Sequence, residues 1–139
     1  MNKALTGSLL AIAFAYASGA SAHHSFAAYD MTKSITFVGT VQSLKFRNPH
    51  IAMTLAHKNK DGSTEIIHFT DGAPANMLVR MGLMPSMIKV GTKITVIGSP
   101  RKDARKEYFL KTVILADGRK FNSLKPRAPE HSSRAPKPD

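Results

Sequence analysis

The chain has no cysteine and no tryptophan among its 139 residues, and it carries only 9 acidic side chains against 20 lysines and arginines. Without cysteine, neither disulfide bonds nor thiolate metal sites can hold the fold together, so ordinary packing must stabilise it. The excess of cations favours anionic partners such as phospholipid headgroups, lipopolysaccharide or nucleic acid.

Signatures of catalysis are also missing. The sequence holds no glycine-rich phosphate loop, no cysteine nucleophile and no serine nucleophile elbow. Several of the few carboxylates fall in expected turns, so a paired acid–base site is not indicated. We therefore expect a binding protein and not an enzyme.

The N-terminus has the pattern of a secretory signal peptide. Lys3 is followed by an uncharged, mostly apolar run to Tyr16 and then by Ala20-Ser21-Ala22, whose small residues suit signal peptidase. The run is shorter than the roughly 20 apolar residues of a membrane anchor. We expect Sec export, cleavage after Ala22, and residence in the periplasm or outside the cell. Removing these 22 of 139 residues leaves 117, and the loss of Lys3 lowers the net charge from +11 to +10.

The rest of the chain divides into short β-rich runs separated by turn residues. Gly39 inside the first run marks a bulge or bend, and Asp61-Gly62 marks a hairpin turn. The pattern predicts strands at 35–46, 51–57, 64–69, 93–99 and 108–115, with a helix from Pro74 to Gly82 between the third strand and the fourth. This order predicts an all-β fold with one short helix, a five-stranded OB-like barrel.

Four parts follow from this pattern. Residues 1–22 are the signal peptide, 23–33 an extended N-terminal segment, 34–123 the OB-like β domain, and 124–139 a basic, proline-rich tail. The tail is expected to be disordered, because it has hardly any apolar side chains to bury. The mature chain therefore has room for one folded domain.

Four short motifs carry a resemblance to a known family: Ala22-His23-His24-Ser25-Phe26, Gly39-Thr40-Val41, Asn48-Pro49-His50 and Asp117-Gly118-Arg119. Together they resemble a family of small secreted bacterial proteins of unknown function, of the DUF6152 type. The resemblance implies export and a compact β domain. More loosely, the strand order is similar to that of small periplasmic OB-fold proteins, including copper chaperones that use a histidine, methionines and a tryptophan. This chain has no tryptophan.

The first mature residues form a candidate copper site. If cleavage falls after Ala22, the free amine and the imidazole of His23 can chelate one ion, and one more imidazole gives three nitrogens in a T shape that suits copper. His50 is the best third ligand, because Pro49 stiffens the backbone before it, and His24 is a flanking or alternative ligand. If cleavage falls one residue earlier, the mature chain begins Ala22-His23-His24. A free amine with histidine as the third residue binds Cu(II) or Ni(II) in a square plane. The alternative is that the histidine pair is only a polar start of the mature chain.

Two other sets of side chains are weaker candidates. Thioether clusters suit Cu(I), although methionine at helical spacing more often fills a core. Four methionines follow this spacing: Met77, Met81, Met84 and Met87. His57 and His68 stand on the second and third expected strands, where they could be cross-strand neighbours that share a site or ordinary surface histidines.

The loop between the last two expected strands is strongly basic. OB-folds bind oligonucleotides and sugars beside this loop, and Tyr108 and Phe109 could supply stacking surfaces there. Export argues against nucleic acid, so the expected ligand is an anionic lipid or polysaccharide of the envelope; the alternative is a solvated cationic loop. The four candidate anion-binding residues are Arg101, Lys102, Arg105 and Lys106.

Three functions are compatible with these patterns. The first is a periplasmic binding protein that takes copper through its mature N-terminal histidine. The second is an envelope interaction module that uses the basic loop, and the third is a structural protein with no ligand. The patterns leave the oligomeric state open.

Overall fold

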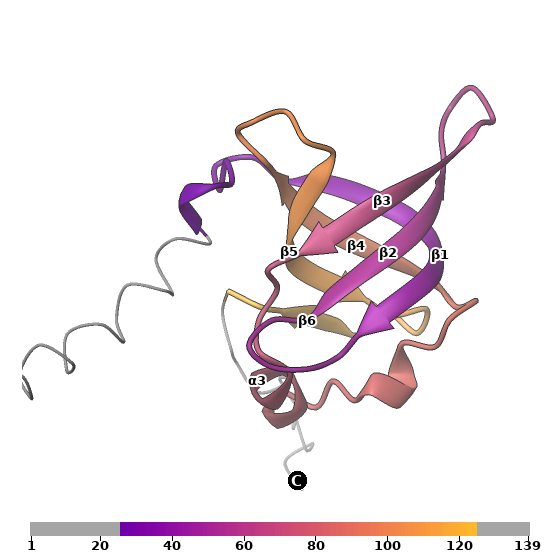
Figure 1. The fold of residues 1–139 in the computed structure, drawn as a ribbon. Helices are drawn as coiled ribbons and strands as arrows, with labels where there is room; N and C mark the ends of the chain where they lie inside the picture. Colours follow the sequence, from indigo (N-terminus) through magenta and orange to yellow (C-terminus); the bar gives the residue numbers. More distant parts are fainter. Residues whose placement is uncertain (1–25, 125–139) are drawn as a thin grey trace, which may run out of the picture.

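The computed structural model describes residues 26–124 and contains one closed β-barrel (Figure 1). Its elements in chain order are β1 (Ile35–Lys45), β2 (Ala52–Lys58), β3 (Thr64–Thr70), the helix α3 (Ala75–Arg80), the 3₁₀ turn η1 (Pro85–Met87), β4 (Lys93–Pro100), β5 (Glu107–Ile114) and β6 (Lys120–Asn122). The spatial order of the ring is β3-β2-β1-β4-β5, and parallel pairing of β3 with β5 closes it. The expected five-stranded OB-like barrel with one short helix is confirmed.

The long first strand serves two neighbours. Its N-terminal half, from Ile35 to Thr40, pairs with β4, and its C-terminal half, from Gly39 to Lys45, pairs with β2. A register shift between Val41 and Ser43 bends the strand. This irregularity lies just after Gly39, from which a bulge or bend was expected.

Gly39 itself sits where the two partners meet. A Cβ atom there would lie 2.7 Å from the carbonyl oxygen of Ala56 on β2. The bend therefore combines a bulge with a close approach of two backbones, which only glycine permits.

The barrel interior follows the alternation expected for β2. Ile51, Met53 and Leu55 are at most 2% exposed, whereas Ala52 and Thr54 between them are only partly buried. The inward side chains of the other strands join them in one continuous core. Because a strand alternates its side chains between two faces, the apolar pattern alone fixed which face lies inside.

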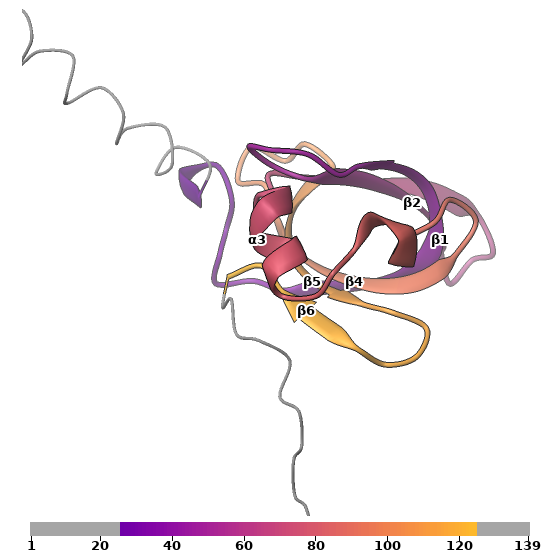
Figure 2. The same ribbon diagram turned by 90° about the horizontal axis from the view of Figure 1, so that it is seen from below.

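The segment between β3 and β4 closes one end of the barrel. Figure 2 shows α3 and η1 lying across this end. Leu78, Leu83 and Ile88 of this segment are at most 2% exposed and fill the opening. The expected helix end at Gly82 is close to the observed one, since α3 stops at Arg80 and Gly82 has a φ of +88°.

Two features of the fold were not expected. β6 pairs with β5 from Thr112 to Ile114, outside the ring, and is not among the five expected strands. Strands this short carry too few residues to show an alternation, so their pairing depends on the neighbouring strand.

The second feature is the conformation of residues 26–34, here named the N-terminal strap. This region was expected to be extended, but Phe26 and Ala27 have helical geometry and Tyr29 forms an isolated bridge with Arg101. Tyr29 is only 1% exposed, so the strap belongs to the folded domain. The expected signal peptide and all but the first residue of the expected basic tail lie outside the described residues.

Candidate functional site

His50 is held in one orientation at the start of β2. Its ring nitrogen Nδ1 lies 2.9 Å from the carbonyl oxygen of Gly72. Because a carbonyl oxygen only accepts, Nδ1 carries a proton, so in the neutral ring Nε2 keeps the lone pair. Metal-binding histidines are commonly oriented this way, with the second ring nitrogen donating to a backbone carbonyl.

The partner turn of His50 packs tightly against the same strand. Gly72 N donates to Ile51 O and Ile51 N donates to Ala73 O, both at 3.3 Å. A Cβ atom on Gly72 would lie 2.8 Å from Cγ1 of Ile51, so only glycine fits there. Asp71, just before it, has a φ of +53°, in the left-handed region that aspartate tolerates better than most residues. This turn and His50 are therefore fixed relative to each other.

A cavity of about 280 Å³ opens beside His50. Its walls come from the strap, the β1–β2 loop, the turn after β3, α3, β5 and the residue after β6, and they are mainly apolar. The lining residues are Phe26, His50, Asp71, Gly72, Ala73, Pro74, Met77, Phe109 and Ser123. An imidazole, a carboxylate and a thioether thus share one cavity with two phenylalanine rings.

The strap supplies one wall of this cavity. The ring of Phe26 lies 5.2 Å from that of Phe109, and Tyr29 meets the same ring edge-on at 5.7 Å. Both contacts place the beginning of the described chain beside His50. The strap residues give no signal in the strand pattern, so sequence reasoning missed this wall.

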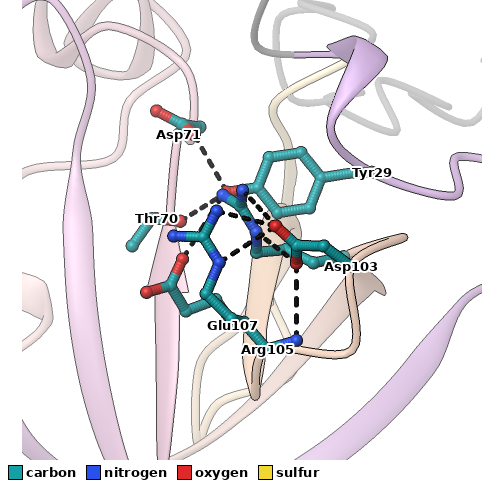
Figure 3. Close-up of polar contacts among 7 residues, drawn as sticks. Tyr29, Thr70, Asp71, Asp103, Arg105 and Glu107 are labelled. Carbon is teal, nitrogen blue, oxygen red and sulfur yellow. Dashed lines mark hydrogen bonds and ion pairs between the residues drawn. The ribbon is translucent and has the colours of Figure 1, made fainter.

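Tyr29 also links the strap to the turn after β3, as Figure 3 shows. Its hydroxyl donates to Asp71 Oδ2 at 2.9 Å and lies 2.6 Å from the hydroxyl of Thr70. Burial is the main cause that raises the pKa of Tyr29 above its ordinary value; Asp71 raises it further and the Thr70 hydrogen bond opposes both. The phenol therefore stays protonated and keeps donating to the carboxylate that lines the cavity.

The N-terminal part of the expected copper site, His23 and His24, lies outside the described residues. Within residues 26–124, no three histidine or acidic side chains come together in a metal-binding group. A site at His50 therefore needs a donor from beyond this range, or one of another type such as the thioether of Met77.

The four methionines have different environments and do not share one site. Met77 lines the His50 cavity, whereas Met81 is 5% exposed in the core and Met84 is 40% exposed. Met87 packs partly against the core, with its Sδ atom 3.9 Å from Nη1 of Arg119. Gly82 and Pro85 break the helix, so the regular spacing does not become one stripe.

The idea that His57 and His68 face each other across β2 and β3 is wrong. The register places His57 opposite Glu65, and His68 opposite Thr54. His57 instead donates through Nδ1 to the carbonyl oxygen of Val38 at 2.8 Å. The turn between the strands sets this register, and three positions separate the two histidines along the ladder.

The expected anion-binding loop neutralises much of its own charge. Arg101 pairs with Asp103 at 2.9 Å and with Glu107 at 3.4 Å, and Arg105 pairs with the same Asp103 at 2.7 Å (Figure 3). Lys106 pairs with Glu65 at 2.6 Å.

These ion pairs shift the pKa values of the charged groups in the loop. Hydrogen bonds from Arg101 and then Arg105 lower the pKa of Asp103 well below its ordinary range, and Asp103 in turn raises the pKa of both arginines. Of the four candidate residues, Lys102 alone makes no ion pair within the described chain.

The two aromatic residues after this loop do not form a stacking platform. Phe109 is only 3% exposed, and Tyr108 packs against Phe37 with ring centroids 4.7 Å apart. Phe109 packs against the strap and Tyr108 packs against the core, so neither ring is free to stack on a ligand. Anion binding by the loop stays a prediction, without the aromatic surfaces that were expected beside it.

A family model matches residues 11–109, from the apolar N-terminal run through the barrel to β5. The chain belongs to the family of unknown function DUF6152. The matched range includes the His23-His24 pair, His50, the cavity turn and the strap. No curated protein matches the chain, and no solved structure matches it either. Between residues 26 and 124, no helix is long and apolar enough to cross a bilayer.

Proposed function

We propose that this chain is an exported binding protein that holds a copper ion at the His50 cavity. His50 contributes its Nε2 atom, and His23, as the first mature residue, contributes its amine and its imidazole. His24 is a flanking or alternative ligand. The observation that carries the proposal is the hydrogen bond from Nδ1 of His50 to Gly72 O, which leaves Nε2 as the lone-pair donor beside the cavity.

The position of Phe26 supports a ligand from the N-terminus. Phe26 lines the cavity and follows His23 by three residues. Three residues of chain span at most about 10 Å, so the N-terminal amine of His23 is within reach of the cavity that Phe26 lines. Amine and imidazole nitrogens suit copper, and Met77 offers a softer donor on another wall.

Binding fits the chemistry of the cavity better than catalysis does. Among the described residues that line it, the carboxylate of Asp71 accepts a hydrogen bond from Tyr29, and the imidazole of His50 donates to a backbone carbonyl. Both groups are thus held in place. An apolar wall also limits access of water to a bound ion, which strengthens the interaction between the ion and its ligands.

Calorimetric titration of Cu(II) into the chain from His23 to Asp139 tests the proposal. We expect one tight site that weakens by at least about tenfold in His50→Gln, since a direct ligand should cost no less than an outer-shell partner. His68→Gln, a change at an exposed position of β3, is the matched control and should bind like the parent. One alanine added before His23 should weaken the site as well, because it removes the chelating amine.

Two results would contradict copper binding at this site. One is equal affinity of the parent, His50→Gln and the extended chain. The other is an affinity that does not fall below about pH 6, because amine and imidazole nitrogens must lose their protons to bind a metal. N-terminal sequencing of the protein from a periplasmic fraction tests export and the cleavage position separately.

A further inference from the structure

The segment that closes one end of the barrel carries positive charge and no carboxylate of its own. No aspartate or glutamate occurs between Asp71 and Asp103, the stretch that contains α3, η1 and β4. Arg80 and Lys89 are exposed on the part that crosses the barrel end, and neither makes an ion pair within residues 26–124. Among the residues that the structure describes, Arg80 and Lys89 are therefore exposed cations without an ion pair at this end.

Another cation joins them from the β1–β2 loop. Arg47 is exposed there, and this loop is tied to α3 because the backbone N–H of Asn76 donates to Oδ1 of Asn48 at 3.2 Å. The three cations thus come from two chain segments that meet at one end of the barrel.

Large apolar side chains are exposed on the same segment. Val79 is 38% exposed, Met84 40% and Val90 67%, the highest value among the exposed large hydrophobic residues of the described chain. Val90 follows Lys89 directly and precedes the turn at Gly91, which has a φ of +86°. We name Arg47, Val79, Arg80, Met84, Lys89 and Val90 the cap surface.

The two ends of the barrel differ in how many of their cations form ion pairs. The β4–β5 loop, at the end opposite α3 in Figure 1, pairs its arginines with Asp103 and Glu107. Between residues 26 and 124, the cap surface has no such partner for Arg80 or Lys89. Within the described residues, the cap surface therefore holds more unpaired cations than the loop, where Lys102 alone makes no ion pair.

We propose that the cap surface docks onto a membrane that contains anionic phospholipid. Apolar side chains between cations are the pattern of surfaces that enter the headgroup region, where the cations contact phosphate and the apolar groups leave water. A polysaccharide would offer the cations a partner but no apolar phase for Met84 and Val90. This docking is independent of copper binding and uses none of the cavity residues.

Co-sedimentation with vesicles tests the proposal. The chain from His23 to Asp139 is used, because the apolar run of residues 4–16 would itself bind lipid. We expect it to bind vesicles of phosphatidylglycerol and phosphatidylcholine, to bind pure phosphatidylcholine weakly, and to lose affinity with added salt. Arg80→Gln with Lys89→Gln should lower the partition coefficient by about tenfold or more, since one cation near an anionic surface contributes about fivefold.

Matched variants separate this surface from general charge and general hydrophobicity. Lys58→Gln with Lys60→Gln removes two charges from the β2–β3 hairpin, and Ile66→Ser removes a 45% exposed side chain from the barrel wall. Both should bind like the parent, whereas Met84→Ser with Val90→Ser should bind several-fold more weakly.

Four results would overturn docking at the cap. The first is that the hairpin variant loses as much vesicle affinity as the Arg80 and Lys89 variant, which would show that binding depends on total charge and not on the cap surface. The second is that the serine variants of Met84 and Val90 bind unchanged. The third is that deletion of residues 125–139 abolishes binding while the cap variants keep it. The fourth is that the parent does not bind the anionic vesicles.

Discussion

The hydroxyl of Tyr29 donates to Asp71 Oδ2 at 2.9 Å, although 42 positions separate the two residues in the chain. Tyr29 lies in the strap and Asp71 in the turn after β3, so this hydrogen bond joins two segments that both line the His50 cavity region. The guanidinium of Arg101 lies 5.4 Å from the centre of the same tyrosine ring. One buried phenol thus connects the strap, the cavity turn and the β4–β5 loop.

Tyr29→Phe should therefore lower the free energy of unfolding by about 1–3 kcal/mol, because it leaves the partners of a largely buried hydroxyl without their hydrogen bond. Urea unfolding followed by circular dichroism measures the effect. Tyr108→Phe is the control, since its hydroxyl makes no side-chain hydrogen bond within residues 26–124. Equal destabilisation by the two variants would show that the hydroxyl contacts of Tyr29 contribute little.

Lys111 on β5 should anchor the strap. It is only 9% exposed, and Nζ donates to Met31 O, Lys33 O and Ser34 Oγ, each at 2.9 Å. Lys111→Met removes these donors and leaves two carbonyl oxygens without them, so we expect a loss of about 1–3 kcal/mol.

Hydrogen exchange should then show faster exchange in residues 29–34 than in β2 of the same variant. Lys93→Met, at an exposed position of β4, should leave the strap unchanged. Uniformly faster exchange throughout the barrel would mean that Lys111 stabilises the whole fold and not the strap in particular.

Gly39→Ala should destabilise the barrel where β1 changes partners. The new methyl group would lie 2.7 Å from Ala56 O and 3.2 Å from Leu55 Cβ, so the two strands must separate. Overpacking of this kind costs about 1–3 kcal/mol. Thermal unfolding compares this variant with Thr40→Ala on the same strand, and a smaller loss for Gly39→Ala than for Thr40→Ala would be incompatible with the close approach.

The acid limb of the stability curve should depend on Asp103. Arg101 and Arg105 lower the pKa of this carboxyl in the folded chain below its ordinary value of 3.8. Because the folded pKa is depressed, the stabilisation that this carboxylate gives is present above the ordinary value of 3.8 and is lost as the pH falls toward the folded pKa.

Nuclear magnetic resonance titration of the Asp103 carboxyl should therefore give a pKa below 3.8, and Arg101→Gln should move it back toward that value. Asp103→Asn should flatten the loss of stability below pH 4. A titration at the ordinary value in the parent would show that the ion pairs do not persist in solution.

Much of the fold could be predicted because strand signals are local. Alternation placed Met53 and Leu55 inside, Gly39 marked the bend, and the order of strands and helix predicted the barrel. β6 escaped prediction because three residues cannot show a period. The strap was missed because Tyr29 is buried by partners far along the chain.

The site could be predicted only in part. His50 was identified from its place after Pro49, but the carbonyl that orients it belongs to Gly72, 22 positions later. The charge of the β4–β5 loop was evident, yet its ion pairs include Glu65 on β3, 41 positions before Lys106. The sequence shows how many charged residues the loop has, but it does not show which of them form ion pairs with distant residues.

The sequence by itself determined the composition, the alternation, the breaks between strands and therefore the order of elements, because each depends on residues a few positions apart. The tertiary structure decided the cross-strand register of His57 and His68, the burial of Tyr29, the walls of the His50 cavity and which cap cations lack an ion pair within residues 26–124. These depend on which distant segments pack together. That choice is made by closure of the whole barrel, since no single segment buries its apolar face alone.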